Sequence, residues 1–538
     1  MVSGSSCPVR RPRIFLFPAI GAMVVLAWLN RFIQDDAFIS FRYARNLARG
    51  LGLVWNPGER VEGYTNFLWT VLMAIPHRIG INPVGFSFGL GLALFWLSLY
   101  LTYRVAKLVL GSEGSALLAV VLLGTNYTFS AFATSGMETQ LQAFLFVLVV
   151  LLFLRLGAEG SKISGAVFLS AVLGLAVLTR PDSGLLVVLL LPLAFRRLWQ
   201  KRDRRIPGLL ALALPFIAMV GPGLAWKLTF YGNLLPNTFY AKAPGLVSVV
   251  QGGYYIVLFI CTYLLFMLIP LAVRAAIRWW KTGGNGLRVL ASVIVLWVGY
   301  VFVIGGDFME FRMLVPIMPF LFILIVCALF SEVARPGRRA ALVGVIVAGS
   351  FLHGAWYRKL YTDPEAVTIL ASHLSSHGLN WIGIGRALGR AFGPESDVVI
   401  ATTTAGAIPY YSGMRTVDML GPNDPWVARK GRFLGPRVGH RRVATIEYLV
   451  QRRVNFVIGH PMLVRSDSVA DMAGPSRFGF RDTDPIPENA RFVEIPIDRG
   501  YRLVALYLTP SARADSVIAA RRWRVRPVRS PTGLQQLP

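Results

Sequence analysis

About eleven apolar runs, most of them close to 20 residues long, occupy the first 356 residues and restrict what this chain can fold into. A helical run of that length matches the hydrocarbon thickness of a lipid bilayer. With 55% hydrophobic and 15% charged residues, the chain is also too apolar for an ordinary soluble enzyme. We therefore predict a polytopic α-helical membrane protein with about eleven transmembrane helices. The predicted spans are 14–33, 84–106, 115–134, 139–156, 163–179, 184–197, 208–229, 250–273, 288–305, 312–331 and 340–356.

The positive charges of the chain fall mostly at the ends of these apolar runs. A net charge of +28 would suggest nucleic-acid binding in a soluble protein, but here the basic clusters alternate with the spans in a way that puts them on one side. By the positive-inside rule that side is cytoplasmic, and so is the N-terminus. We predict a multi-pass protein of the bacterial cytoplasmic membrane, in contact with membrane lipids and with no nucleic-acid partner.

The sequence pattern changes after about residue 358. Short apolar strands at 397–401 (DVVIA) and 455–460 (NFVIGH) flank a helical segment at 446–453. We predict a membrane domain over 1–357, with its first outer loop at 34–82, and an extracytoplasmic soluble α/β domain over 358–520. The last segment, 521–538, is basic and contains proline, and we expect it to be disordered.

The first outer loop, residues 34–66, is polar, aromatic-rich and dense in charge. Asp35 and Asp36 stand side by side at its start, within about a turn of the membrane boundary. Helical spacing of apolar residues predicts an amphipathic surface helix over 36–49. The apolar segment 66–80 is too short for a crossing, and counting it as one would move the basic clusters outside, so we interpret it as a second surface helix. One Asp of the pair would suffice as a helix cap, and two favour a functional site.

The outer face of the predicted topology collects carboxylates, cations and aromatic side chains. A carboxylate there can deprotonate an acceptor hydroxyl, and cations can stabilise a lipid phosphate as it leaves. An alternative interpretation is that Arg180, Asp182 and Glu138 only complement span ends and helix dipoles. The candidate catalytic residues are Asp36 and Asp35. The candidate substrate-binding residues are Arg42, Tyr43, Glu62, Tyr64, Asn66, Glu138, Arg180, Asp182, Asn237, Lys242, Asp307, Arg312 and His460.

Soluble cofactors are not indicated. The chain has no P-loop, no GxGxxG after a strand and no Cys/His metal spacing, so no cofactor is certain. An adjacent Asp pair can bind a metal ion, which leaves open a divalent cation bridging carboxylates and phosphate. In the C-terminal domain, polar residues after the strands, among them Asp418, Asn423 and His460, would face a ligand in an α/β sheet or would simply form turns.

At these residues the chain resembles the GT-C membrane glycosyltransferases, and within them the mycobacterial-type terminal arabinofuranosyltransferase group. The resemblance rests on DDAFISFRYARNLARGLGLVWNPGERVEGYTNFLW, SGMET, TRPD and GGDFMEFRMLVPIMP, and more loosely on TTTAGAIPYYSGMRTVDMLGPND. It implies an inverting transferase that uses a polyprenyl-phosphate sugar, with Asp35 or Asp36 as general base and 66–80 as a juxtamembrane helix. Candidates for binding the donor phosphate are Arg180, Lys242 and Arg312.

The expected function is transfer of a sugar, with arabinofuranose one candidate, to a glycan or lipid acceptor of the cell envelope. A transporter or flippase of a lipid-linked sugar is the main alternative. It would place ionisable residues near mid-span and interrupt helices in paired halves. A glycan-binding assembly protein, with the soluble domain doing the work, is a third possibility. Clustering of the acids at one face favours the enzyme.

Overall fold

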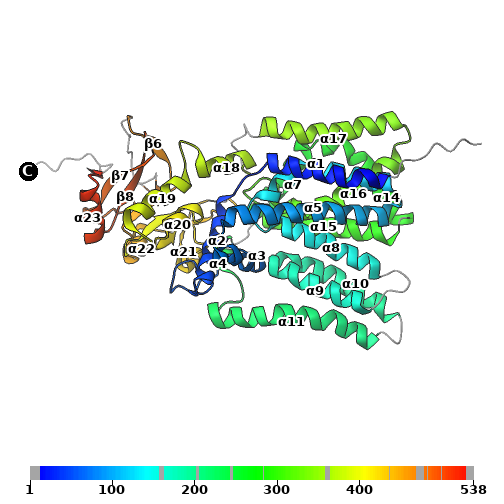
Figure 1. The fold of residues 1–538 in the computed structure, drawn as a ribbon, viewed down its shortest axis with the longest axis horizontal. Helices are drawn as coiled ribbons and strands as arrows, with labels where there is room; N and C mark the ends of the chain where they lie inside the picture. Colours follow the sequence, from blue (N-terminus) through cyan, green and yellow to red (C-terminus); the bar gives the residue numbers. More distant parts are fainter. Residues whose placement is uncertain are drawn as a thin grey trace, which may run out of the picture. The chain divides into compact units, whose positions relative to one another are not determined.

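The computed structural model describes residues 12–156, 163–200, 205–242, 246–282, 284–357, 364–394, 396–435, 437–467, 478–481, 483–498 and 500–528. The chain forms two compact units (Figure 1). The first, which we call the helical unit, comprises Met1–Phe32, Ser87–Gly223 and Ser248–Ala366. The second, the α/β unit, comprises Ile33–Phe86, Leu224–Val247 and Val367–Pro538. The first outer loop thus packs with the C-terminal segment, whereas the sequence analysis assigned it to the membrane domain. The predicted domain limits at 357 and 520 remain a prediction.

The helical unit is built from apolar helices. Its helices are α1 (Leu16–Leu29), most of α5 (Pro83–Leu110), α6 (Glu113–Gly124), α7 (Tyr127–Ala131), α8 (Thr139–Leu156), α9 (Ile163–Thr179), α10 (Gly184–Trp199), most of α11 (Arg205–Tyr231), α13 (Leu246–Thr262), α14 (Ile269–Thr282), α15 (Asn285–Ile304), α16 (Met318–Glu332) and α17 (Pro336–Trp356). Short 3₁₀ turns join them: η1 (Pro12–Phe15), η2 (Phe132–Thr134), η3 (Pro181–Ser183), η5 (Leu265–Leu268) and η6 (Arg312–Ile317).

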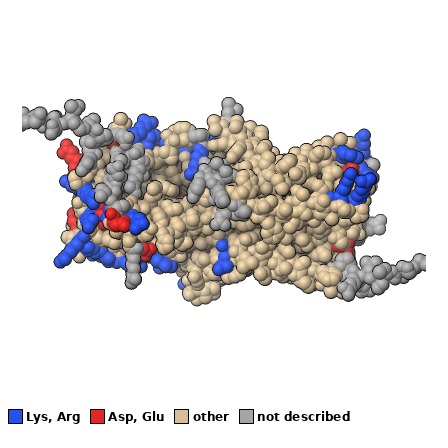
Figure 2. All heavy atoms as spheres, turned by 90° about the horizontal axis from the view of Figure 1, so that it is seen from above, with Lys and Arg blue, Asp and Glu red and all other residues tan. Residues whose placement is uncertain are grey.

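Each predicted span coincides with one of these helices or with a bent pair. Among the described residues, five helices are long and apolar enough to cross a membrane, and seven if each of two bent pairs counts as one span. The pairs α6–α7 and α13–α14 bend by 72° and 84°. The polytopic helical fold is confirmed, and the count of about eleven remains a prediction. Figure 2 shows Lys and Arg gathered at one end of the helical unit, with a flank almost free of charge.

The α/β unit contains a mixed seven-stranded sheet. Its main path runs β2 (Thr416–Asp418), β1 (Ile400–Thr402), β5 (Phe456–Gly459), β8 (Tyr501–Tyr507), β7 (Arg491–Asp498) and β9 (Arg524–Pro527), while β6 (Leu463–Arg465) pairs with β8. β1 is parallel to β2 and β5, with Ile400 opposite Thr416 and Phe456, and the remaining pairs are antiparallel. A separate two-stranded sheet joins β3 (Arg432–Phe433) and β4 (Arg442–Val443).

The helices of the α/β unit are mostly short, and α2, α19, α21, α22 and α23 have a side chain that caps their first turn. They are α2 (Asp35–Ala48), α3 (Phe67–Leu72), α4 (Ala74–Ile79), α12 (Asn237–Lys242), α18 (Val367–Ser375), α19 (Trp381–Phe392), α20 (Ala407–Ser412), α21 (Pro425–Lys430), α22 (Ile446–Gln451) and α23 (Ala512–Ala520). The predicted strands and helix of the C-terminal domain correspond to β1, β5 and α22. The prediction of disorder from Arg521 onward is wrong for its first part, because Arg524–Pro527 forms β9 against β7. Residues 529–538 lie outside the described residues.

Candidate functional site

The Asp pair begins helix α2, as the sequence predicted within one residue. The backbone N–H of Asp35 donates to Gln34 Oε1, which starts the helix, and Gly50 (φ +78°) and Gly52 (φ +87°) follow its end in backbone conformations that suit glycine. The Asp35 carboxylate accepts from two backbone N–H groups of the C-terminal segment, Gly406 at 3.2 Å and Ala407 at 2.7 Å. Asp35 therefore caps the first turn of α20 rather than its own helix.

The contact between Gly406 and Asp35 leaves no room for a side chain at position 406. A Cβ atom on residue 406 would lie 1.9 Å from the Asp35 carbonyl oxygen, so the close approach requires glycine. Asp35 is buried, and burial raises its pKa to about 7, with the charge of Asp36 adding to the rise. The N–H groups of Ala407 and Gly406 oppose this by favouring the ionised form.

Asp36 has a different environment from its neighbour. Adjacent residues of a helix point about 100° apart around its axis, so Asp36 cannot share the contact that Asp35 makes with α20. Its side chain is only partly buried. The structure thus separates the pair into a buried carboxylate that holds two segments together and a more accessible one.

Arg42 is a core residue and not an open cationic site. Its guanidinium is buried and donates to the carbonyl oxygens of Trp55 (2.7 Å), Pro409 (2.5 Å) and Met414 (2.8 Å), and to Asn56 Oδ1 (3.0 Å). Burial, with Arg45 adding, lowers its pKa to about 9. Three backbone carbonyl oxygens and one amide oxygen therefore satisfy this guanidinium.

The tyrosines of the first loop are buried in the same network. Tyr43 Oη donates to the Val61 carbonyl oxygen at 2.7 Å and accepts from Gly63 N at 2.9 Å. Its ring meets the Tyr64 ring edge to face at 4.9 Å, and Tyr64 Oη lies 3.2 Å from Tyr231 Oη. Burial raises the pKa of Tyr43 and of Tyr64 well above the ordinary value. In this arrangement the two phenols order the loop.

Glu62 is the other carboxylate of the loop that the structure singles out. It pairs with Lys227 of α11 at 2.8 Å, with little of either side chain exposed. Burial raises the pKa of Glu62 to about 7 against the opposing effect of Lys227. A lysine partner stabilises the ionised form, so this pair is a salt bridge rather than a free base.

Two asparagine candidates also tie segments together. Asn66 Oδ1 accepts from Ser40 Oγ (3.2 Å) and Thr70 Oγ1 (2.9 Å), joining α2 to α3. Asn237 Nδ2 donates to the carbonyl oxygens of Gly421 (2.7 Å) and Pro422 (3.0 Å). The side chain of Lys242 lies outside what the structure describes.

The helical unit holds a second group of candidates, centred on Arg180 between α9 and η3. Its guanidinium binds Asp182 Oδ2 at 2.6 Å and Glu138 Oε1 at 2.9 Å. Gln142 Nε2 donates to Asp182 Oδ1 at 2.9 Å, so this carboxylate has an amide partner as well. All three charged side chains are largely buried, with 14%, 6% and 2% exposed for Arg180, Asp182 and Glu138.

A second ion pair lies beside the first. Arg312 contacts Asp307 Oδ2 through Nε at 2.6 Å and through Nη2 at 2.5 Å. Arg312 Nη1 also reaches Met137 Sδ at 3.6 Å, and Arg180 Nη2 reaches Met313 Sδ at 3.9 Å. These contacts bring together three segments that the sequence singled out, at 135–140, 179–183 and 305–312.

Sequence reasoning missed a buried acid and base next to this group. His353 Nε2 lies 2.7 Å from Glu310 Oε1, and Thr128 Oγ1 donates to the same oxygen at 3.0 Å. The rings of Tyr263 and Tyr357 pack on the imidazole at 5.1 and 5.0 Å. The signal available was Glu310 inside GGDFMEFR and a histidine inside an apolar run.

The polar residues after the C-terminal strands form turns. Asp418 accepts from the N–H groups of Leu420, Gly421 and Asn423, and Asp424 caps α21 and accepts from Tyr448 Oη at 2.9 and 2.8 Å. His460 is exposed beside Trp381. Within the described residues, no group of three or more His, Cys, Asp or Glu side chains is arranged to hold a metal ion.

Comparison with solved structures identifies proteins of similar fold. The crystal structure of ArnT from Cupriavidus metallidurans bound to undecaprenyl phosphate matches 92% of this chain and 97% of its own, with a TM-score of 0.54 and 13% identity. Its apo form matches with a TM-score of 0.50. The chain therefore has the fold of ArnT, a polytopic helical fold with a C-terminal domain, as the sequence analysis predicted.

Two curated proteins are similar to this chain in sequence. Terminal β-(1→2)-arabinofuranosyltransferases are 32% identical over 339 residues in Corynebacterium glutamicum and 30% identical over 282 residues in Mycobacterium tuberculosis. The matches cover 53% and 48% of this chain but only 46% and 43% of those proteins, so the chain spans less than half of their length. Residues 72–226 match the family of dolichyl-phosphate-mannose-protein mannosyltransferases, and residues 371–525 match a domain of unknown function, DUF8728.

Proposed function

We propose that this protein is an inverting glycosyltransferase that moves a sugar from a polyprenyl-phosphate donor to an acceptor glycan or lipid of the cell envelope. The GT-C fold supports the reaction class, because a structural neighbour binds undecaprenyl phosphate. Relatives named as terminal arabinofuranosyltransferases favour arabinofuranose as the sugar. The reaction is placed at the outer face of the bacterial cytoplasmic membrane, with the N-terminus inside and the C-terminal segment outside.

The observation that carries the proposal is the division of roles within the Asp pair. Asp35 is held by the N–H groups of Gly406 and Ala407, while Asp36 is only partly buried one residue further along α2. Asp36 is therefore assigned as the general base. It takes the proton of the acceptor hydroxyl as that oxygen bonds to the anomeric carbon, and the bond from the anomeric carbon to the phosphate oxygen breaks. Polyprenyl phosphate leaves with the electron pair, and the anomeric configuration inverts.

The donor phosphate is assigned to the cations of the helical unit, Arg180 and Arg312. Both are held by carboxylates, and each also has one weak contact to a methionine sulfur, Met313 and Met137 respectively. A thioether is a poor acceptor, so a phosphate oxygen can replace it without breaking the ion pairs. Glu138, Asp182 and Asp307 would then orient the guanidinium groups rather than act on the sugar.

The test is transfer by the purified full-length protein. It is incubated with polyprenyl-phosphate arabinofuranose, mannose and other sugars in turn, together with envelope glycans, and the products are analysed by mass spectrometry. Addition of one sugar residue from one donor, with release of polyprenyl phosphate, is expected. Movement of the lipid-linked sugar across a vesicle membrane without any glycosidic product would instead identify a transporter and refute the proposal.

A further inference from the structure

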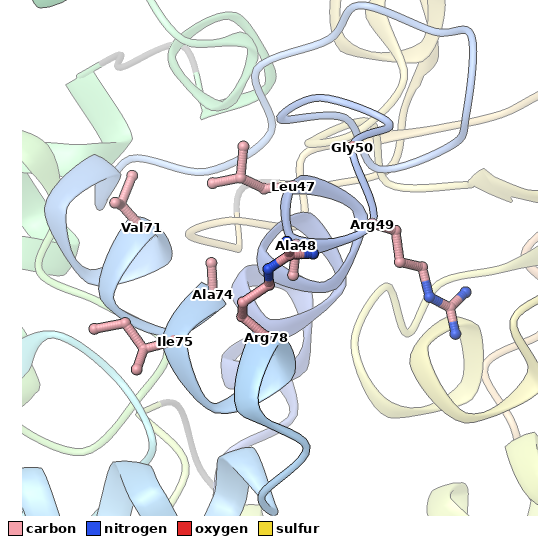
Figure 3. Close-up of a pocket in the computed structure, with 8 residues that line it drawn as sticks. All are labelled: Leu47, Ala48, Arg49, Gly50, Val71, Ala74, Ile75 and Arg78. Carbon is pink, nitrogen blue, oxygen red and sulfur yellow. The ribbon is translucent and has the colours of Figure 1, made fainter.

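The α/β unit contains a pocket of about 490 Å³ that none of the proposed roles uses (Figure 3). It lies between the end of α2 and the pair α3–α4. Its lining consists of Leu47, Ala48, Arg49, Gly50, Val71, Ala74, Ile75 and Arg78. The wall is therefore apolar except for two arginines.

The segments that line this pocket carry basic residues and no acidic ones. The sequence has no Asp or Glu from Ala37 to Gly58, nor from Gly63 to Ser112. Arg49 and Arg78 are exposed, and neither has an ion-pair or side-chain hydrogen-bond partner among the described residues. Nearby His77 does not offset this, because burial, with Arg45 adding, lowers its pKa to about 4 and keeps it neutral. The pocket has unbalanced cations and no acid of its own.

The two arginines differ in direction. Figure 3 shows Arg78 extending from α4 across the pocket toward Ala48, whereas Arg49 points away from it. Arg78 can thus donate to a group inside the pocket. Arg49 contributes only its charge to the surroundings.

The rim of the pocket is apolar and belongs to a segment anchored to membrane helices by short links. Ile75 of the lining is 44% exposed, and Leu51 and Ile79, which follow the lining residues Gly50 and Arg78 in the chain, are 48% and 62% exposed. Three residues separate the end of α4 from α5, which is long and apolar enough to cross a membrane. Exposed isoleucines next to arginines are typical of a surface that lies at the boundary between headgroups and acyl chains.

We propose that this pocket binds the headgroup of an anionic membrane phospholipid, with Arg78 on the phosphate and an acyl chain along Ile75 and Val71. The inference goes beyond sugar transfer and does not depend on it. A purely structural role is the competing account, in which Arg78 complements the negative end of the α2 dipole. That account predicts a change in stability on mutation and no change in lipid preference.

The experiment is native mass spectrometry of the full-length protein in detergent, titrated with phosphatidylglycerol or with phosphatidylcholine. Wild type should bind the anionic lipid more tightly. Arg78→Gln should reduce that preference about fivefold or more, and Arg78→Lys should retain most of it. Arg49→Gln is the matched control, with the same charge change at a side chain that points away, and it should lose clearly less.

The remaining outcomes count against the proposal. Equal binding of both lipids by wild type would overturn it, as would an unchanged preference in Arg78→Gln or an equal loss in Arg49→Gln. Displacement of phosphatidylglycerol by equimolar undecaprenyl phosphate, or by millimolar inorganic phosphate, would assign the pocket to a different ligand and likewise overturn it.

Discussion

Two largely buried aspartates of the α/β unit and two of the helical unit are held in different ways. In the α/β unit, Asp35 and Asp418 accept hydrogen bonds from backbone N–H groups. In the helical unit, Asp182 and Asp307 are paired with guanidinium groups. Burial raises the pKa of Asp35 to about 7 although its backbone N–H partners favour the ionised form, so the proton affinity of this carboxyl stays high. In the helical unit the guanidinium groups that bind carboxylates are of the kind that also binds phosphate. The difference teaches that a proton acceptor is to be sought near α2 and a phosphate site near Arg180.

The largest expected effect is the loss of turnover when Asp36 is replaced. Asp36→Asn keeps the size of the side chain and removes proton acceptance, so turnover should fall roughly 10²–10⁴-fold with donor affinity largely kept. Steady-state kinetics and a donor-binding titration check this. If both Asp36→Asn and Asp35→Asn transfer sugar at near-normal rates, the base lies elsewhere, with Asp307 and Glu138 next in line, and the comparison between the units fails.

The ion-pair cluster of the helical unit should respond in stability. Arg180→Gln leaves two buried carboxylates, Asp182 and Glu138, without their cation, and should cost about 3–5 kcal/mol. Thermal unfolding of the full-length protein in detergent measures it. Arg415→Gln is the control, because Arg415 is 54% exposed and its partner Glu59 keeps Arg452, so the loss there should be about 1 kcal/mol or less. Equal losses in the two variants would show that the Arg180 cluster does not stabilise the unit.

The close approach of α20 to α2 should be sensitive to one added methyl group. Gly406→Ala places a Cβ atom 1.9 Å from the Asp35 carbonyl oxygen, and the required shift should cost roughly 1–3 kcal/mol. Gly378→Ala, in the same unit but with nothing within 4 Å of the added atom, should be nearly neutral. If the two alanine variants unfold at the same temperature, the packing of Gly406 on Asp35 is not important for stability.

The mildest expected effect is that of Asp35→Asn. An amide has one acceptor oxygen in place of two, so one of the N–H groups of Gly406 and Ala407 loses its partner, at a cost of about 1 kcal/mol. Transfer should continue, in contrast to Asp36→Asn. Loss of turnover as severe as that of Asp36→Asn, in a protein of normal stability, would exchange the roles of the two residues.

The same residue gives stability a pH dependence with a defined sign. A carboxyl whose pKa is raised from 3.8 to about 7 binds more protons in the folded state between these values. Its contribution to stability is therefore full below pH 4 and is lost as the pH rises toward 7. Glu62, raised to about 7, and Asp418, raised to about 6, act in the same direction. Asp35→Asn should flatten this decline in a series of melting curves, and an unchanged slope would contradict the assignment.

Patterns that depend on local periodicity could be predicted from the sequence. The apolar spans, helix α2 and strands β1 and β5 follow from hydrophobic period and turn residues. The hairpin β7–β8 and strand β9 were missed because alternation in Arg491–Asp498 is interrupted by proline and charge, and because β9 gains its order only by pairing with β7.

The candidate site could be predicted only in part, because burial is a property of the whole fold. Helix geometry requires that Asp35 and Asp36 point in different directions, but it does not show that the partners of Asp35 come from residues 406 and 407. In the same way, the amphipathic pattern predicts that Arg42 is an exposed cation. Only its contacts with residues far along the chain show that it is buried. The three segments that meet at Arg180 and Arg312 were grouped correctly, because topology placed them at one face.

The bonds between α2 and the C-terminal segment also impose an order on biogenesis. Asp35 and Arg42 are synthesised early, yet their partners at Gly406, Ala407, Pro409 and Met414 lie 367 to 372 residues further along the chain. At about 5–20 residues per second, the ribosome needs roughly 20–70 s to make that interval. During this time Asp35 and Arg42 lack their partners from the C-terminal segment, so their polar groups stay incompletely satisfied, and the packing of the first loop is completed late in synthesis.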